Sequence, residues 1–178
     1  MVLYFLALLP PEDLREKVKE IKLEISRCYG ASHALKSPAH ITLQMPFRKK
    51  ESAEQSMEEA LSGFSEKCKP FYIELGGFDF FPPKVIFIRI SDHRPLVALR
   101  NNLLPVLWER LELTKKQTGN RFHPHLTVAT RDLKDEAFPV AREDFSGREF
   151  SSGFEVKSLY LLKHNGKNWD IFKEFPFS

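Results

Sequence analysis

The sequence predicts an α+β fold of two similar lobes, with antiparallel sheets lining a central cleft. The first observation behind this prediction is a repeated motif, because "HITL" begins at His40 and "HLTV" begins at His125, each shortly after a proline. The two histidines lie 125 − 40 = 85 residues apart in a chain of 178 residues, close to half its length. A repeat at this spacing indicates a duplicated structural unit.

The order of the expected elements is the second observation. Strand, helix, His-containing strand and helix in the first half are followed by strand, helix, His-containing strand and further strand in the second. No linker or low-complexity segment divides the chain. We therefore expect duplicated strand-helix units related by pseudo-twofold symmetry, within a single domain that spans residues 1–178.

The expected elements of the first half begin with a buried strand over residues 2–9. Pro10, Pro11 and two acidic residues then open a helix that Gly30 ends. The apolar residues of this helix recur at helical spacing: Leu14, Val18, Ile21 and Ile25. A short strand follows over residues 40–45, and a second helix over residues 51–67.

Strands return in the second half, over "FYIELGGFDFF" and "KVIFIRI", with Pro82 and Pro83 between them. A third helix is expected over residues 94–114, kinked or split at Pro105. The second His-containing strand covers residues 125–130, and a loop or short helix without clear periodicity follows it. The final apolar segment predicts two strands around a turn at Asn165-Gly166.

The composition, 42% hydrophobic and 29% charged residues, is that of a soluble globular protein. A formal charge of +3 suits an anionic ligand but would not by itself hold duplex DNA. The apolar opening has no basic region or cleavage site and runs directly into "PPEDLREK", so neither a signal peptide nor a membrane span is expected. Cys28 and Cys68 show no metal or disulfide spacing and are expected on apolar helix positions. We expect a cytoplasmic monomer.

The repeated motif has a chemical meaning on a strand, where residues i and i+2 point to the same face. His40 and Thr42 then face one way while Ile41 anchors the strand on the other side, and the second motif does the same with His125 and Thr127. Two imidazoles can accept and donate protons near neutral pH, and two hydroxyls can donate hydrogen bonds to an anionic oxygen. These four residues suit proton transfer at a phosphodiester, with no metal required.

The two motifs and the opening "LYFLALLPPEDL" resemble the two-histidine phosphoesterase superfamily, most closely its bacterial 2'-5' RNA ligase-like branch. The resemblance implies a bilobal α+β fold and cofactor-free phosphodiesterase chemistry on RNA 2',3'-cyclic phosphate ends, 2'-5' linkages or cyclic nucleotides. It implies His125 as the base for water and His40 as the acid for the departing ribose oxygen. Bacterial relatives often place Arg where this chain has Thr130, with Arg131 following, and a basic residue where it has Gln44.

Four residues beside the motifs are candidates for substrate binding. Phe47 and Phe122 could stack on a base, although in a chain with 16 phenylalanines core packing is the favoured role for either one. Arg121 and Arg131 could contact phosphates or be solvated surface charges.

Two alternatives remain open at this point. His123 and His125 form a His-x-His pair that could bind zinc from one strand face. The chain could also be a non-catalytic module that binds RNA or nucleotides with the same fold. Of the other histidines, His33 is expected in a loop near the first motif, and His93 and His164 are expected to face solvent.

Overall fold

The computed structural model describes residues 1–119 and 121–178, and in this part of the chain eight strands form one antiparallel sheet. The strands are β1 (Val2–Leu8), β2 (Ile41–Lys49), β3 (Phe71–Phe81), β4 (Val85–Ile90), β5 (Leu126–Ala129), β6 (Ser151–Val156), β7 (Ser158–His164) and β8 (Trp169–Pro176). The helices are α1 (Glu12–Tyr29), α2 (Glu54–Ser65), α3 (Arg94–Glu109), α4 (Lys115–Thr118) and α5 (Phe138–Ser146), with short 3₁₀ turns η1 (His33–Lys36) and η2 (Glu51–Ala53). The predicted α+β class is confirmed.

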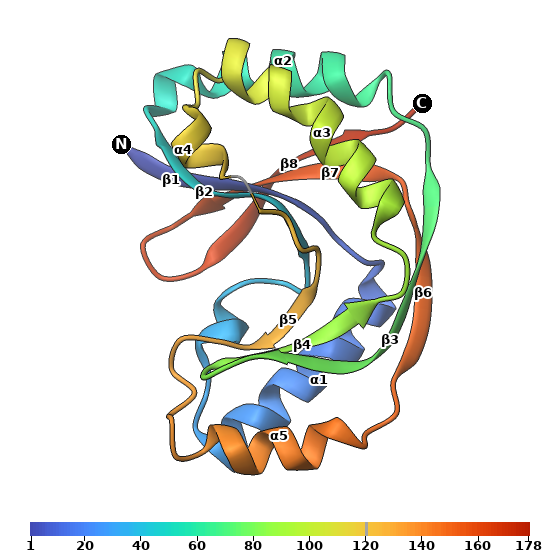
Figure 1. Ribbon diagram of the computed structural model, residues 1–178. Helices are drawn as coiled ribbons and strands as arrows, with labels where there is room; N and C mark the ends of the chain where they lie inside the picture. Colours follow the sequence, from blue (N-terminus) through green and yellow to red (C-terminus); the bar gives the residue numbers. More distant parts are fainter. Residues whose placement is uncertain (120) are drawn as a thin grey trace.

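The strand order is β6-β3-β4-β5-β2-β1-β7-β8, so the two motif strands, β5 and β2, lie side by side in the middle. Four strands stand on each side of this junction, as the expected pseudo-twofold symmetry requires. The two lobes are therefore halves of one continuous curled sheet rather than separate sheets. Helices α2, α3 and α4 lie by one half and α1 and α5 by the other (Figure 1).

The halves exchange a helix, because α1 follows β1 in sequence but packs against β5 in the other half. Its predicted apolar stripe is buried. Acidic residues in its first turn complement the positive end of the helix dipole, and Gly30 ends it in the left-handed region at φ 72°. The predicted turn at Asn165-Gly166 is also present, because the Asn165 side chain accepts hydrogen bonds from the backbone N–H groups of Lys167 and Asn168.

Several expected elements differ from the structure. The helix expected from Glu51 begins as the turn η2, and the one expected to reach Thr114 ends at Glu109. Pro105 does not split α3, which continues through it from Arg94 to Glu109, and its exposed position lets water bind the carbonyl group of Asn101 that the proline leaves without a donor. By contrast, the segment after the second motif strand, expected as a loop or short helix, agrees with the structure: it contains the short helix α5, which buries Phe138, Ala141 and Phe145.

The C-terminal segment forms three strands rather than two. An interruption at Lys157 separates β6, which pairs with β3, from β7, which pairs with β1 in the other half of the sheet. The chain therefore crosses from one half to the other at this point.

The cysteines do not occupy the expected apolar helix positions. Cys28 is exposed, and Cys68 is half-buried beyond the end of α2. Within the described residues we find no helix with both the length and the apolar character needed to cross a membrane. The monomeric state and the cytoplasmic location stay predictions.

Candidate functional site

The two motifs meet where β2 and β5 pair, and the recorded partners are Ile41 and Leu126. Both side chains are fully buried on the helix-covered face of the sheet. Because antiparallel strands run in opposite directions, this pair also sets the partners of the residues on either side. His40 lies opposite Thr127, and Thr42 lies opposite His125. This register places each histidine across the strands from the threonine of the other motif.

All four motif residues line one pocket of about 270 Å³, which we call the motif pocket. Its charged lining residues are Lys22, Lys36 and Arg131, and none of the Asp or Glu side chains that the structure describes lines it. His33 also reaches the pocket, from η1. A cavity lined by positively charged side chains attracts anions.

Hydrogen bonds fix both imidazoles in the same way. His40 Nδ1 lies 2.7 Å from the carbonyl oxygen of Pro38, and His125 Nδ1 lies 2.7 Å from that of His123. Because a carbonyl oxygen can only accept, each Nδ1 carries the proton and donates it. In the neutral rings Nε2 therefore keeps a free lone pair for a ligand.

Aromatic rings and burial set the pKa values of both histidines. Phe5 packs against His40 with ring centroids 4.8 Å apart, and Phe87 packs against His125 at 4.9 Å. Burial lowers the pKa of His40 from 6.5 to about 4, the bond to Pro38 opposes this change, and the charge of Lys22 adds to it. Burial also lowers the pKa of His125. Both rings are therefore neutral at pH 7 in the empty protein.

Lys22 is a residue of the site that the sequence analysis missed. It comes from α1, its side chain is 3% exposed, and its Nζ donates to the carbonyl oxygens of Ala34 (2.9 Å) and Ser37 (3.1 Å). Burial lowers its pKa to about 8. The available signal was its position, because Lys22 lies four residues after Val18 on the buried stripe of the helix.

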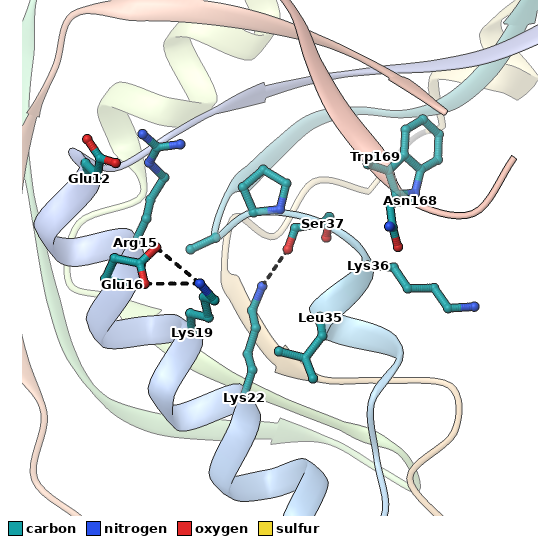
Figure 2. A pocket seen from close by; sticks show the side chains of 12 residues that line it. Glu12, Arg15, Glu16, Lys19, Lys22, Leu35, Lys36, Ser37, Asn168 and Trp169 are labelled. Carbon is teal, nitrogen blue, oxygen red and sulfur yellow. Dashed lines mark hydrogen bonds and ion pairs between the residues drawn. The ribbon is translucent and has the colours of Figure 1, made fainter. Parts of the chain in front are cut away.

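The backbone segment that Lys22 holds also borders a second pocket, the α1 pocket, of about 280 Å³ (Figure 2). Lys22, Lys36, Ser37 and Trp169 line both pockets. Lys22 therefore ties α1 to the segment that ends in Pro38, whose carbonyl orients His40.

The four flanking candidates have different positions. Phe47 is 3% exposed in the core, where it packs against Tyr4, so it cannot stack on a base. Phe122 is half-buried, with the guanidinium of Arg100 6.0 Å from its ring centroid, and Arg121 is exposed; neither lines the motif pocket. Arg131 does line it.

Arg131 reaches the pocket through an unusual backbone conformation, with φ at 58°. A non-glycine residue in this left-handed region is uncommon and often marks a functional turn. The next residue, Asp132, anchors the turn because its carboxylate accepts from the backbone N–H groups of Ser32 (2.9 Å) and His33 (2.8 Å). Arg131 therefore lines the pocket although it stands one place beyond the Arg position of bacterial relatives. Gln44 is buried and accepts a hydrogen bond from Arg100, so no cation occupies that second position.

His123 pairs with His93 rather than with His125. The ring centroids of His93 and His123 are 4.8 Å apart, whereas those of His123 and His125 are 6.2 Å apart. His93 and His164 are both half-buried, contrary to the expectation that they face solvent. Among the described residues no group of three or more His, Cys, Asp or Glu side chains could hold a metal ion.

Comparison with known proteins places this geometry in a family. The family model for the 2'-5' RNA ligase superfamily matches residues 10–168. The RNA 2',3'-cyclic phosphodiesterase of Archaeoglobus fulgidus is 28% identical over 161 residues, which are 88% of this chain and 88% of that protein. The protein of the same name from Bacillus subtilis is 28% identical over 141 residues, 75% of this chain and 74% of that protein.

Solved structures share the fold. TT0787 of Thermus thermophilus superposes with a TM-score of 0.69 at 19% identity, and E. coli LigT complexed with ATP with a TM-score of 0.68 at 18% identity. LigT complexed with 3'-AMP gives 0.64 at 17% identity. Each alignment covers 99% of this chain and 98% of the other. Because the family model covers most of its length, the chain belongs to the 2'-5' RNA ligase superfamily, the two-histidine phosphoesterases that its paired motifs resemble.

Proposed function

We propose that this protein hydrolyses 2',3'-cyclic phosphates at RNA ends, and related cyclic or 2'-5' linked nucleotides, without a metal ion. The observation that carries the proposal is the pairing of Ile41 with Leu126, since it gathers two imidazoles and two threonines in one cation-lined pocket. The names of the two relatives support the choice of substrate. The nucleotides in the LigT structures support a nucleotide-sized ligand.

The chemistry divides among the four motif residues. One imidazole accepts a proton at Nε2 from water as the water oxygen bonds to phosphorus, and the other gives a proton to the ribose oxygen as its bond to phosphorus breaks. Thr42 and Thr127 donate hydrogen bonds to the non-bridging phosphate oxygens, which gain charge in the transition state. The product is a phosphomonoester on one ribose oxygen and a hydroxyl on the other.

The division of roles is part of the proposal. The family resemblance makes His125 the base and His40 the acid. In the empty protein the pKa of His40 is about 4, so His40 can act as the acid only once the bound phosphate offsets its burial. The negative charge of the phosphate raises the pKa of both rings, and the cations Lys22, Lys36 and Arg131 bring the phosphate there.

Incubation with a short RNA that ends in a 2',3'-cyclic phosphate tests the function. We expect conversion to a terminal phosphomonoester, which chromatography separates from the substrate. Binding of this RNA without any product would instead support the non-catalytic RNA- or nucleotide-binding module. The four intact motif residues favour the enzyme, because a binding module has no need for two proton-transfer groups.

A further inference from the structure

Another pocket adjoins the motif pocket along β3 and β4, with a volume of about 570 Å³. Its lining includes Asp79, Phe87, Arg89, Ser91, His93 and His123, and we call it the His93 pocket. Its volume falls within the range of small-ligand sites. The chemistry proposed above does not use it.

Two phenylalanine rings lie at the boundary of the two pockets, because Phe87 lines the His93 pocket and Phe81 lines the motif pocket. Phe87 packs against both His125, at 4.9 Å between ring centroids, and His123, at 5.9 Å. Phe81 contacts both histidines at 5.2 Å. The centroids of His123 and His125 are 6.2 Å apart. A ligand in the His93 pocket would therefore be an immediate neighbour of a nucleotide in the motif pocket.

The backbone of β3 is shaped around the guanidinium of Arg89. Its Nε donates to the carbonyl oxygen of Gly76 at 3.0 Å, where the β3-β4 register shifts. Gly77 has φ 63°, and a Cβ there would lie 2.7 Å from the Arg89 Nη2. A side chain at Gly77 would thus displace the arginine. Within the described part of the chain Arg89 forms no ion pair, so its outer N–H groups can bind an anion.

The other polar groups of the pocket suit the remainder of a nucleotide. The rings of His93 and His123 meet at 4.8 Å and 88° and offer imidazole surfaces for a base. Asp79 also lines the pocket, with one carboxylate oxygen held by the backbone N–H of Phe80 at 2.8 Å. Its other oxygen can accept hydrogen bonds from ribose hydroxyls or base N–H groups, and the Ser91 hydroxyl can accept from or donate to them.

We propose that the His93 pocket binds the nucleotide next to the reacting end of an RNA strand, with its backbone phosphate against Arg89 and its base against His93 and His123. This inference rests on the proposed function, because it assumes RNA as the substrate. The subsite predicts that the protein acts on a strand more efficiently than on a mononucleotide. The α1 pocket is the competing path: Lys19 there is paired with Glu16 at 3.2 Å (Figure 2), whereas Arg15 forms no ion pair in the described part of the chain, so the test below includes Arg15.

The test compares two substrates in matched variants. kcat/KM is measured for a 2',3'-cyclic mononucleotide and for a tetranucleotide with the same cyclic end, in wild type, Arg89→Gln and His93→Ala. We expect each variant to lose about tenfold on the tetranucleotide, mostly through KM, and Arg89→Gln to keep wild-type turnover of the mononucleotide. Arg94→Gln is the control, because Arg94 is exposed, lies outside the His93 pocket and is paired with Asp92 at 2.8 Å.

A second measurement separates this inference from the proposed function. Binding of an unreactive tetranucleotide 3'-phosphate is followed by fluorescence anisotropy in the same variants. Arg89-dependent binding without turnover by the wild type would refute the proposed function and keep the subsite. Three results would overturn the subsite. The first two are equal losses on both substrates and no loss on either substrate. The third is a loss of the strand preference only in Arg15→Gln, a variant of the α1 pocket.

Discussion

Replacing Lys22 by Met tests how a buried ammonium shapes the site. The unbranched Met side chain fills a similar space but removes the charge and both donors to the carbonyls of Ala34 and Ser37. Lys19→Met is the matched control, because Lys19 lies on the same helix with its side chain 55% exposed. The two variants therefore differ in burial and not in the chemistry of the substitution.

The magnitude follows from the pKa of Lys22. A fall from 10.5 to about 8 corresponds to about 3 kcal/mol, at about 1.36 kcal/mol for each tenfold change in proton affinity. Between these pH values the unfolded chain binds more protons at this residue than the folded protein does. The contribution of Lys22 to the free energy of unfolding therefore rises by about 3 kcal/mol from pH 7 to above pH 10.5. At pH 7 the variant avoids the cost of burying the Lys22 charge. However, the two carbonyl groups that lose their donor lower its free energy of unfolding by about 1 to 3 kcal/mol each.

Urea unfolding of wild type and Lys22→Met at neutral pH and at pH 10.5 measures this contribution. We expect the wild type to gain about 3 kcal/mol relative to Lys22→Met across this interval, and no such gain relative to Lys19→Met. A difference between wild type and Lys22→Met that stays constant with pH would refute the reasoning. A second readout is the pKa of His40, which should rise in Lys22→Met because the charge of Lys22 contributes to lowering it.

Four further predictions concern the chemistry. His40→Ala and His125→Ala should each reduce kcat by roughly 10²- to 10⁴-fold with an unchanged circular dichroism spectrum, and full activity in either would exclude that ring. Thr42→Ala and Thr127→Ala should lose less, about tenfold each, because each removes one hydrogen bond to the phosphate; a larger loss than in the histidine variants would contradict this order. Hydrolysis should survive EDTA, whereas a dead protein revived by zinc or magnesium would support metal catalysis. kcat/KM against pH should be bell-shaped with both midpoints below 6.5, because burial lowers both histidine pKa values in the free protein; a flat profile with chemistry rate-limiting would contradict paired catalysis.

The motif residues could be predicted from sequence because their information is local. Alternation on a strand places His40 and Thr42 on one face, and a repeat of the pattern indicates a repeat of the unit. The pairing of Ile41 with Leu126 could not be predicted in this way, since it joins strands far apart in sequence. The break at Lys157 could not be predicted either. The strands β6 and β7 follow each other in one apolar stretch of sequence, yet they pair with strands in different halves of the sheet.

Other features of the site depend on tertiary contacts. Arg131 enters the motif pocket through a left-handed backbone conformation, which the sequence does not indicate because no glycine stands at that position. The contact of Asp132 with η1 stabilises this turn. Lys22 has the residue type of a surface position, and only the packing of α1 buries it. Phe47 has the residue type of a base-stacking side chain, yet it packs against Tyr4 in the core, beyond an irregularity in the pairing of β1 with β2 that breaks the strand alternation.

A substrate whose leaving group needs no proton tests the paired-histidine mechanism most directly. The measurement compares kcat of His40→Ala and His125→Ala on a nitrophenyl phosphodiester of a nucleoside with kcat on the 2',3'-cyclic nucleotide. Because nitrophenolate departs without an acid, we expect His40→Ala to regain much of its activity on the nitrophenyl ester while His125→Ala stays slow. Rescue of His125→Ala alone would exchange the two roles. Equal behaviour of the two variants on both substrates would contradict a division of acid and base between these histidines.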